Sequence, residues 1–143
     1  MNEDFVSYEQ AVKLRECGFD EPCNSYYDKT CSNDDEYWHT TRGEVYNWNG
    51  LNSECQISAP TLWQAQKWLR EVKKAVVVVA PETDMADYND IPRDFLTGEW
   101  CYEIWVNGNT HRYGMASYPS YEQALSAGIE MTLKLIEKKG EIK

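Results

Sequence analysis

Two histidines, five cysteines and several acid clusters are the side chains of this chain whose types could do chemistry. The cysteines are odd in number and contain no C-x-x-C pair, a usage typical of thiols in a reducing cytoplasm. Structural zinc sites usually show ligand pairs two to four residues apart, whereas Cys23, Cys31 and His39 are spaced more widely. We therefore expect ordinary thiols and no metal centre.

Catalysis needs a nucleophile, a base and a group that orients the base, and the chain offers only His39 and His111 as histidine bases. The sequence contains no nucleophile elbow, Walker loop, Rossmann fingerprint or His-Glu-x-x-His motif. The acids at 34–36 and at 84, 87 and 90 match no metal-ligand order. The sequence thus predicts a protein that is not an enzyme and that holds no cofactor or metal.

A stripe of one aromatic and three basic side chains is the strongest candidate for binding. Trp63, Lys67, Arg70 and Lys74 follow one another at spacings of four, three and four, which places them on one face of a helix. An exposed aromatic flanked by cations suits an anionic partner, such as nucleic acid or an acidic protein patch. Alternatively, the lysine and arginine stems cover the tryptophan against a loop of the acidic first half. We call these four residues the basic stripe.

The helix that positions the basic stripe is predicted to begin at Thr61, whose hydroxyl can cap it while Gln64 reaches back to the capping amide. Its apolar residues fall within about a third of the circumference, so we expect that face to be buried. The valines at 76–79 follow directly and predict a strand covered on both faces. The expected buried face consists of Leu62, Ala65, Trp68, Leu69 and Val72.

Two further helices are predicted from Ser-x-x-Gln capping boxes. The first begins after Ser7, and Gly18 is placed to end it in a left-handed conformation. The second begins after Ser120 and is the last element of the chain. In this last helix Ala124 and Gly128 lie one turn apart, so it can approach a sheet closely.

Two hairpins are predicted from turn signals. Asn107-Gly108 is the strongest, because these residue types adopt both positive-φ positions of a type I′ turn between residues 99–106 and 109–115. A shorter hairpin is expected from residues 37–41 and 45–48, with Gly43 in the turn.

The predicted order is α-ββ-α-βββ-α, which we interpret as a single α+β domain over residues 1–143. We expect an antiparallel sheet of about five strands with the helices mainly on one face. Polar composition predicts mobile loops near 20–35 and 81–98 and a frayed tail at 139–143. From Thr61 onward the order is also that of double-stranded-RNA-binding domains, although Ser120 and Tyr121 stand where those domains carry phosphate-binding lysines.

The net charge of −10 is spread unevenly. Residues 1–60 carry twelve acids against four bases, whereas residues 61–80 carry one acid against four bases. The negative field of the whole chain argues against strong affinity for nucleic acid. No secretory signal or apolar run of transmembrane length is present, so we expect a soluble cytoplasmic protein that does not enter a membrane.

Four segments, at 18–23, 46–49, 59–71 and 120–124, give the chain its likeness to other proteins. It resembles a family of small uncharacterised phage- and prophage-associated proteins of gut Bacteroidetes. The resemblance covers most of the chain, its most distinctive part is the run at 59–71, and residues 81–98 depart from the pattern. It implies a mobile-element gene in a bacterial cytoplasm, and it implies no activity or functional residues.

Taken together, these patterns predict an accessory protein of a mobile element that binds a host or phage protein through aromatic and acidic surface. Two alternatives stay open. One is a nucleic-acid-binding module that uses the basic stripe, and the other is an acidic DNA mimic that inhibits a host nuclease or restriction factor. The oligomeric state is not predicted by any of these patterns.

Overall fold

A computed structural model describes residues 4–29, 36–41, 43–51, 55–83, 96–107, 109–111 and 117–139. Within these residues the chain forms three α-helices, one short 3₁₀-helix and six strands. In chain order they are α1 (Tyr8–Glu16), β1 (Ser25–Lys29), β2 (Glu36–Thr40), η1 (Trp48–Leu51), β3 (Gln56–Ser58), α2 (Leu62–Val72), β4 (Ala75–Thr83), β5 (Leu96–Val106), β6 (Asn109–His111) and α3 (Tyr121–Lys139).

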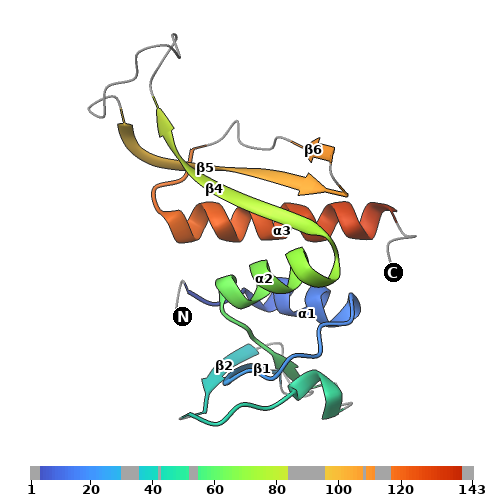
Figure 1. The fold of residues 1–143 in the computed structure, drawn as a ribbon. Coiled ribbons are helices and arrows are strands. Elements are labelled where there is room, and N and C mark those ends of the chain that lie inside the picture. Colours follow the sequence, from blue (N-terminus) through green and yellow to red (C-terminus); the bar gives the residue numbers. More distant parts are fainter. Residues whose placement is uncertain are drawn as a thin grey trace.

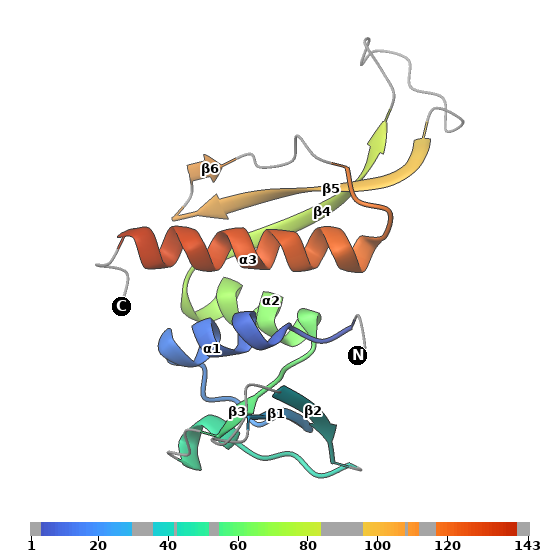
Figure 2. The same cartoon turned by 180° about the vertical axis from the view of Figure 1, so that it is seen from behind.

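The helices lie between two antiparallel sheets (Figure 1). α3 underlies β4 and β5, and α1 with α2 form the next layer, above the strands β1 to β3; the view from behind shows the same order (Figure 2). The predicted α+β class is confirmed. The strands, however, divide between two three-stranded sheets instead of forming one sheet of about five. We call them the N-terminal sheet (β2-β1-β3) and the C-terminal sheet (β4-β5-β6).

The central strand of the N-terminal sheet, β1, occupies part of the segment predicted to be a mobile loop, so that prediction is wrong for Ser25–Lys29. Tyr27 is buried, and its hydroxyl donates to the backbone carbonyl of Val6 at 2.6 Å. Its ring also meets Tyr8 of α1 edge-on, with centroids 5.7 Å apart. One buried tyrosine therefore anchors a strand whose neighbouring residues in the chain are polar.

The hairpin predicted from residues 37–41 and 45–48 is also wrong. β2 pairs with β1, which places Trp38 opposite Tyr27. Tyr46 instead forms an isolated bridge with Cys23, and the chain then enters η1. Both segments pair with residues 23–29, which lie earlier in the chain. A turn motif between the two segments does not indicate such a pairing.

The hairpin predicted from Asn107-Gly108 is confirmed in the C-terminal sheet. β5 pairs with β6 so that Val106 lies opposite Asn109, and Asn107 has the positive φ of 53° that such a turn requires. The part of this hairpin predicted at 112–115 and most of the loop predicted at 81–98 lie outside the described residues. Residues 81–83 and 96–98 belong to β4 and β5.

The valine strand is not covered on both faces by the described residues. Val77 is buried against the helices, whereas Val78 is 41% exposed. β4 is an edge strand with helices on one side, which is why its two faces differ. The uninterrupted run of valines therefore led to a wrong prediction of burial on both faces of β4.

Helix α1 begins as predicted. The Ser7 hydroxyl accepts from the Gln10 amide N–H, and the Gln10 side-chain carbonyl accepts from the Ser7 amide at 2.8 Å, so the capping box is complete. The Gln10 side-chain nitrogen also donates to the carbonyl of Ser126 at 2.9 Å, which joins α1 to α3. Gly18 follows with φ of 98°, as expected for the end of this helix.

Helix α2 begins after Thr61, and the Thr61 hydroxyl accepts from the Gln64 amide at 3.1 Å, as predicted. The predicted hydrogen bond from the Thr61 amide to the Gln64 side chain is wrong, because the Gln64 side chain instead donates to the carbonyl of Pro22 at 3.0 Å. Val72 is 54% exposed, which corrects its predicted burial; it is the last residue of the helix, before the chain turns into β4. The other four predicted core residues are buried: Leu62, Ala65, Trp68 and Leu69.

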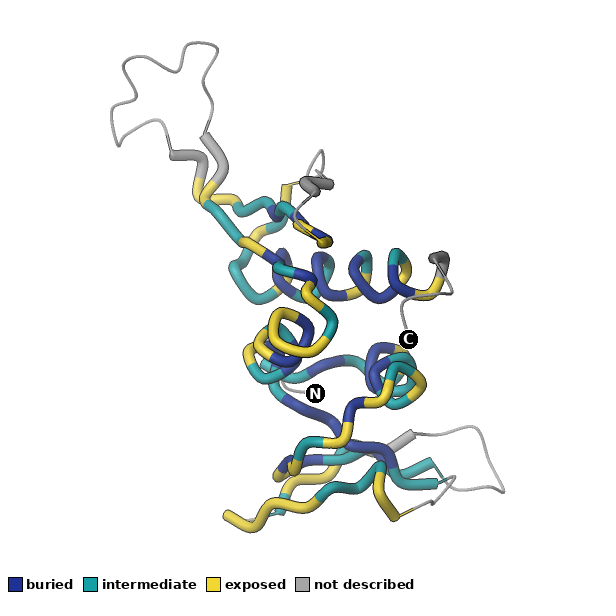
Figure 3. Tube along the Cα trace, turned by 45° about the vertical axis from the view of Figure 1, so that its right-hand side comes forward, coloured by how far each residue is buried: buried dark blue, intermediate teal, exposed yellow. Residues whose placement is uncertain are grey.

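Helix α3 approaches the C-terminal sheet most closely at Gly128. A Cβ atom at this position would lie 2.6 Å from Val77 Cγ1, a separation that side chains do not adopt. This close approach agrees with the expectation from the small residues Ala124 and Gly128. Buried positions recur along all three helices between the sheets (Figure 3). The last residues of the predicted frayed tail, 140–143, lie outside the described residues.

Candidate functional site

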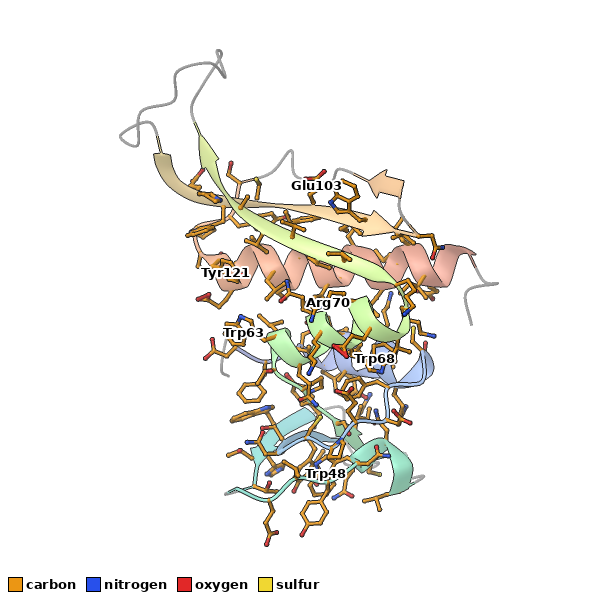
Figure 4. All side chains as sticks on the ribbon, in the orientation of Figure 1. Trp48, Trp63, Trp68, Arg70, Glu103 and Tyr121 are labelled. Carbon is orange, nitrogen blue, oxygen red and sulfur yellow. The ribbon has the colours of Figure 1, made fainter. Side chains whose placement is uncertain are left out.

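All four residues of the basic stripe are exposed on α2 and just beyond its C-terminal end. Trp63 and Arg70 lie on the same helix in Figure 4. Trp63 retains 43% of its surface in contact with solvent, which favours the exposed arrangement over burial beneath the cationic stems.

Two of the three cations in the basic stripe interact with their own helix. The Lys74 ammonium donates to the backbone carbonyl of Glu71 at 2.9 Å, and the Arg70 guanidinium lies 3.8 Å from the Glu71 carboxylate. The Lys74 hydrogen bond is favourable at a helix C-terminus, where carbonyl groups lack partners within the helix, whereas the Arg70 contact is an exposed ion pair between two side chains. Lys67 makes no ion pair with any residue that the structure describes. The basic stripe therefore offers an anion less positive charge than its composition suggests.

A second group of aromatic side chains covers the outer face of the N-terminal sheet. Tyr26 stacks on His39, with ring centroids 5.1 Å apart and planes inclined by 21°. Trp48 packs on Tyr26 at 4.1 Å, and Tyr46 packs on Trp48 at 5.3 Å. Tyr27 points to the helices, so Tyr26, its neighbour in the strand, faces away from them. We call Tyr26, His39, Tyr46 and Trp48 the aromatic surface.

Hydrogen bonds hold the segment that carries Tyr46 and Trp48 on this sheet. Tyr46 exchanges two backbone hydrogen bonds with Cys23, at 2.8 and 2.9 Å. The side-chain carbonyl of Asn49 accepts from the backbone N–H of Ser58 at 3.1 Å, and the backbone N–H of Asn49 donates to the Ser58 hydroxyl at 3.2 Å. The rings are therefore positioned before a partner arrives, which reduces the entropy lost on binding.

Two members of the aromatic surface, His39 and Tyr46, are exposed, Tyr26 and Trp48 are half-buried, and a carboxylate lies beside Tyr46. Tyr46 is 47% exposed, and its chain neighbour Val45 is exposed as well, as is Leu51 at the end of η1. The Tyr46 hydroxyl donates to the Glu44 carboxylate at 2.8 Å. This hydrogen bond, together with the negative charge of Glu44, raises the pKa of Tyr46. Aromatic faces beside a carboxylate suit a cationic side chain.

The thiol considered for a zinc site is buried in the structure. Cys23 is buried, and its Sγ donates to the carbonyl of Glu21 at 3.5 Å and to the Gln64 side chain at 3.7 Å. Burial, followed by the charge of Glu21, raises the pKa of Cys23 to about 12, and a protonated thiol is a poor metal ligand. His39 stacks on an aromatic ring, and Cys31 lies outside the described residues.

The remaining sequence candidates are not brought together. In the described residues no three His, Cys, Asp or Glu side chains form a group that could hold a metal ion. His111 lies in β6, far along the chain from His39 in the other sheet. The acids at 34–35 and at 84, 87 and 90 lie outside the described residues.

The sequence did not predict the aromatic surface. Residues 45–48, which include Tyr46 and Trp48, were predicted as part of a hairpin that does not form, and Tyr26 and His39 were not identified as their neighbours. The signal that could have found them is the Tyr26-Tyr27 pair in a polar segment. Adjacent aromatics in a strand face opposite sides, so one of them must be presented outward when the other is buried.

Comparison with protein-family models, with curated proteins and with solved structures finds no match to this chain. Within the described residues, no helix combines the length and the apolar content that crossing a membrane requires. The basic stripe and the aromatic surface are therefore the features of the described residues that bear on function.

Proposed function

We propose that this protein is a non-catalytic accessory protein that binds a partner protein through its aromatic surface. The observation that carries the proposal is the exposed Tyr46, whose ring packs at a tilt against Trp48 and whose hydroxyl is hydrogen-bonded to Glu44. Tyrosine and tryptophan are enriched among the residues that contribute most to binding at protein interfaces. Val45 and Leu51 extend the same exposed segment with apolar area.

The partner segment that fits this surface is basic. A lysine or arginine over an exposed tyrosine or tryptophan ring gains about 0.5–1 kcal/mol, and more when water is excluded. Glu44 adds a carboxylate beside the rings, and the first sixty residues contain twelve acids against four bases. Such an acid excess steers a basic partner toward this half of the protein.

The resemblance to phage-associated proteins supports a bacterial cytoplasmic setting and a phage or prophage origin. A basic host factor is then a natural partner. The DNA-mimic hypothesis is one form of this proposal, in which the basic partner is a nuclease or restriction factor and the acidic half competes with DNA for it.

Nucleic-acid binding through the basic stripe is the second candidate, and the exposure of Trp63 beside Lys67 favours it. Against it stand the overall charge of −10 and the engagement of Arg70 and Lys74 by Glu71. We expect affinity no tighter than about 10⁻⁴ to 10⁻⁶ M at physiological salt, the ordinary non-specific level.

Site-specific photo-crosslinking in bacterial cells tests the proposal. A benzoylphenylalanine is placed at Val45, beside the aromatic surface, and in a matched variant at Trp63, in the basic stripe. We expect the Val45 variant to crosslink to a basic protein, and Tyr46→Ser in the same background to remove that product. Trp63→Ser is the matched control, because Tyr46 and Trp63 are similarly exposed, at 47% and 43%.

Two outcomes contradict the proposal. If crosslinks form at position 63 and not at position 45, the aromatic surface is not the binding site. If these crosslinks are sensitive to nuclease, and labelled duplex DNA or RNA binds at nanomolar concentration until Lys67 and Arg70 are reversed in charge, the protein is a nucleic-acid-binding module. A steep loss of that binding with added salt would support the same conclusion.

A further inference from the structure

The outer face of β1 carries a second carboxylate beside the aromatic surface. Tyr26 and Asp28 are two residues apart in this strand, so their side chains leave the sheet on the same face. Tyr27 and Lys29 leave on the other face: Tyr27 is buried, and the Lys29 ammonium lies 5.5 Å from the centroid of the Tyr8 ring in α1. An acid, and not a base, therefore follows Tyr26 on the outer face.

No described base compensates the charge of Asp28. Asp28 is half-buried and makes no ion pair with any residue that the structure describes. Its neighbours in the two adjacent strands are Tyr37 and Gln56, which carry no positive charge. In the described part of residues 20–60, Lys29 is the only lysine or arginine, and it is directed toward α1. Asp28 thus retains its negative charge for a ligand.

The aromatic rings connect Asp28 with Glu44, the carboxylate already placed at this surface. Tyr46, which is hydrogen-bonded to Glu44, and Tyr26 both pack on Trp48, with centroids 5.3 and 4.1 Å from it. A carboxylate accepts hydrogen bonds at about four positions, so the bond from the Tyr46 hydroxyl leaves Glu44 able to accept from a ligand. The surface therefore offers two places where an aromatic ring and a carboxylate lie together.

A segment in extended conformation matches this arrangement. Its side chains at positions i and i+2 stand on the same side, about 7 Å apart, whereas neighbours in sequence point to opposite sides. Arginine suits each place better than lysine, because its planar guanidinium stacks on aromatic rings while its edges donate to a carboxylate.

We propose that the aromatic surface binds an extended segment of the partner with two arginines at positions i and i+2. One arginine lies over Tyr46 beside Glu44, and the other lies beside Tyr26 and pairs with Asp28. This inference rests on the proposed function. It adds Asp28 as a binding residue and a pair of arginines as the feature that the partner must carry.

Three acetylated pentapeptide amides test the spacing, each titrated into the full chain at constant ionic strength while NMR follows the Trp48 indole. Gly-Arg-Gly-Arg-Gly presents both arginines on one side when extended. Gly-Arg-Arg-Gly-Gly has the same charge with the arginines on opposite sides, and Gly-Arg-Gly-Gln-Gly has one arginine. We expect the first peptide to bind about fivefold more tightly than the one-arginine peptide, beyond the factor of about two for carrying two copies. The adjacent-arginine peptide should bind more weakly than the first.

Two variants assign the second arginine to its carboxylate. Asp28→Asn keeps the shape of the side chain and should lower the affinity of Gly-Arg-Gly-Arg-Gly to that of the one-arginine peptide. Glu9→Gln is the matched control, because Glu9 is an exposed acid in the same acidic half but lies on α1. It should leave the preference unchanged. Circular dichroism shows whether each variant is folded, and the peptide comparison on the original protein needs no variant.

The inference is overturned if the two peptides of equal charge bind alike, or if folded Asp28→Asn keeps the preference for Gly-Arg-Gly-Arg-Gly. It is also overturned if Glu9→Gln reduces that preference as much as Asp28→Asn does, because the effect would then be one of overall charge. In each of these cases the proposed function stands as long as the one-arginine peptide shifts the Trp48 resonance. If none of the three peptides shifts it, the proposed function is contradicted as well.

Discussion

The two sheets of this protein have three antiparallel strands each, and both contain a long-range pairing, since Ala75 lies opposite Val106 in the C-terminal sheet. They differ in whether a turn motif in the sequence signals the shorter pairing. In the C-terminal sheet, β5 and β6 are neighbours joined at Asn107. In the N-terminal sheet, β1 pairs with β3 so that Tyr27 lies opposite Ile57, thirty residues later. Local turn chemistry fixes the first pairing, whereas the second forms only when distant segments are brought together by burial.

Their outer faces differ as well. The N-terminal sheet presents packed aromatic rings beside Glu44 in an acidic half of the chain, which suits a basic partner. The C-terminal sheet presents an apolar hollow lined by Val76, Val78 and Trp105, with Lys74 and Glu103 beside them. One fold thus offers two outer faces with different chemistry, because the helices cover only the inner face of each sheet.

The largest effect is expected in the helical layer that both sheets share. Leu69 is fully buried in α2, so Leu69→Ala should cost about 2–5 kcal/mol of unfolding free energy through the cavity that it leaves. Lys67→Ala, on the exposed face of the same helix, should stay within about 0.5 kcal/mol. Urea denaturation followed by circular dichroism measures both. Similar midpoints for the two variants would contradict the assigned helix faces.

The C-terminal sheet alone is tested at Gly128. In an exposed helix, replacing glycine with alanine stabilises by about 1 kcal/mol. Here the new methyl group would meet Val77 at 2.6 Å, so Gly128→Ala should instead destabilise the protein by about 1–3 kcal/mol. The thermal unfolding temperature of Gly128→Ala is compared with that of the original protein, and we expect a decrease. An increase would mean that α3 does not approach β4 this closely.

The N-terminal sheet alone is tested at Tyr27. Tyr27→Phe keeps the ring but leaves the buried carbonyl of Val6 without its donor, at a cost of about 1–2 kcal/mol. Tyr46→Phe is the matched control, because its hydroxyl bonds to Glu44 in solvent and should contribute less than about 0.5 kcal/mol. Equal denaturant midpoints for these two variants would place Tyr27 outside the core.

The smallest effect is expected at the start of α2. Thr61→Ala removes the acceptor for the Gln64 amide and should cost about 1 kcal/mol, whereas Thr61→Ser keeps a hydroxyl and should recover most of it. Chemical denaturation compares the two variants. If both unfold at the same denaturant concentration, the hydroxyl of Thr61 does not cap the helix.

The sequence was sufficient where structure depends on neighbouring residues. Ser7 with Gln10 and Thr61 predicted the starts of α1 and α2, and Asn107-Gly108 predicted the turn between β5 and β6. The buried face of α2 was predicted except at Val72, where the helix ends. These features are stabilised by contacts within a few residues, so a short stretch of sequence is enough to predict them.

The sequence was insufficient where structure depends on distant partners. β1 lies in a polar segment, and only its pairing with β2 and β3 and the burial of Tyr27 make it a strand. The aromatic surface depends on the same pairing, so its members could not be grouped before the fold was known. The basic stripe, by contrast, was identified from helical spacing alone, although its contacts with Glu71 were not.

The most direct test of the central claim, that the aromatic surface receives a basic segment, is a titration followed by NMR of the tryptophan indoles. The probe is an acetylated tri-arginine amide, and an acetylated tri-glutamate amide is the opposite-charge control. We predict that tri-arginine shifts the Trp48 indole resonance and leaves that of Trp63 unchanged, and that Tyr46→Ser abolishes the shift. The claim is contradicted if Trp48 does not respond to tri-arginine, or if the larger response is that of Trp63 to tri-glutamate.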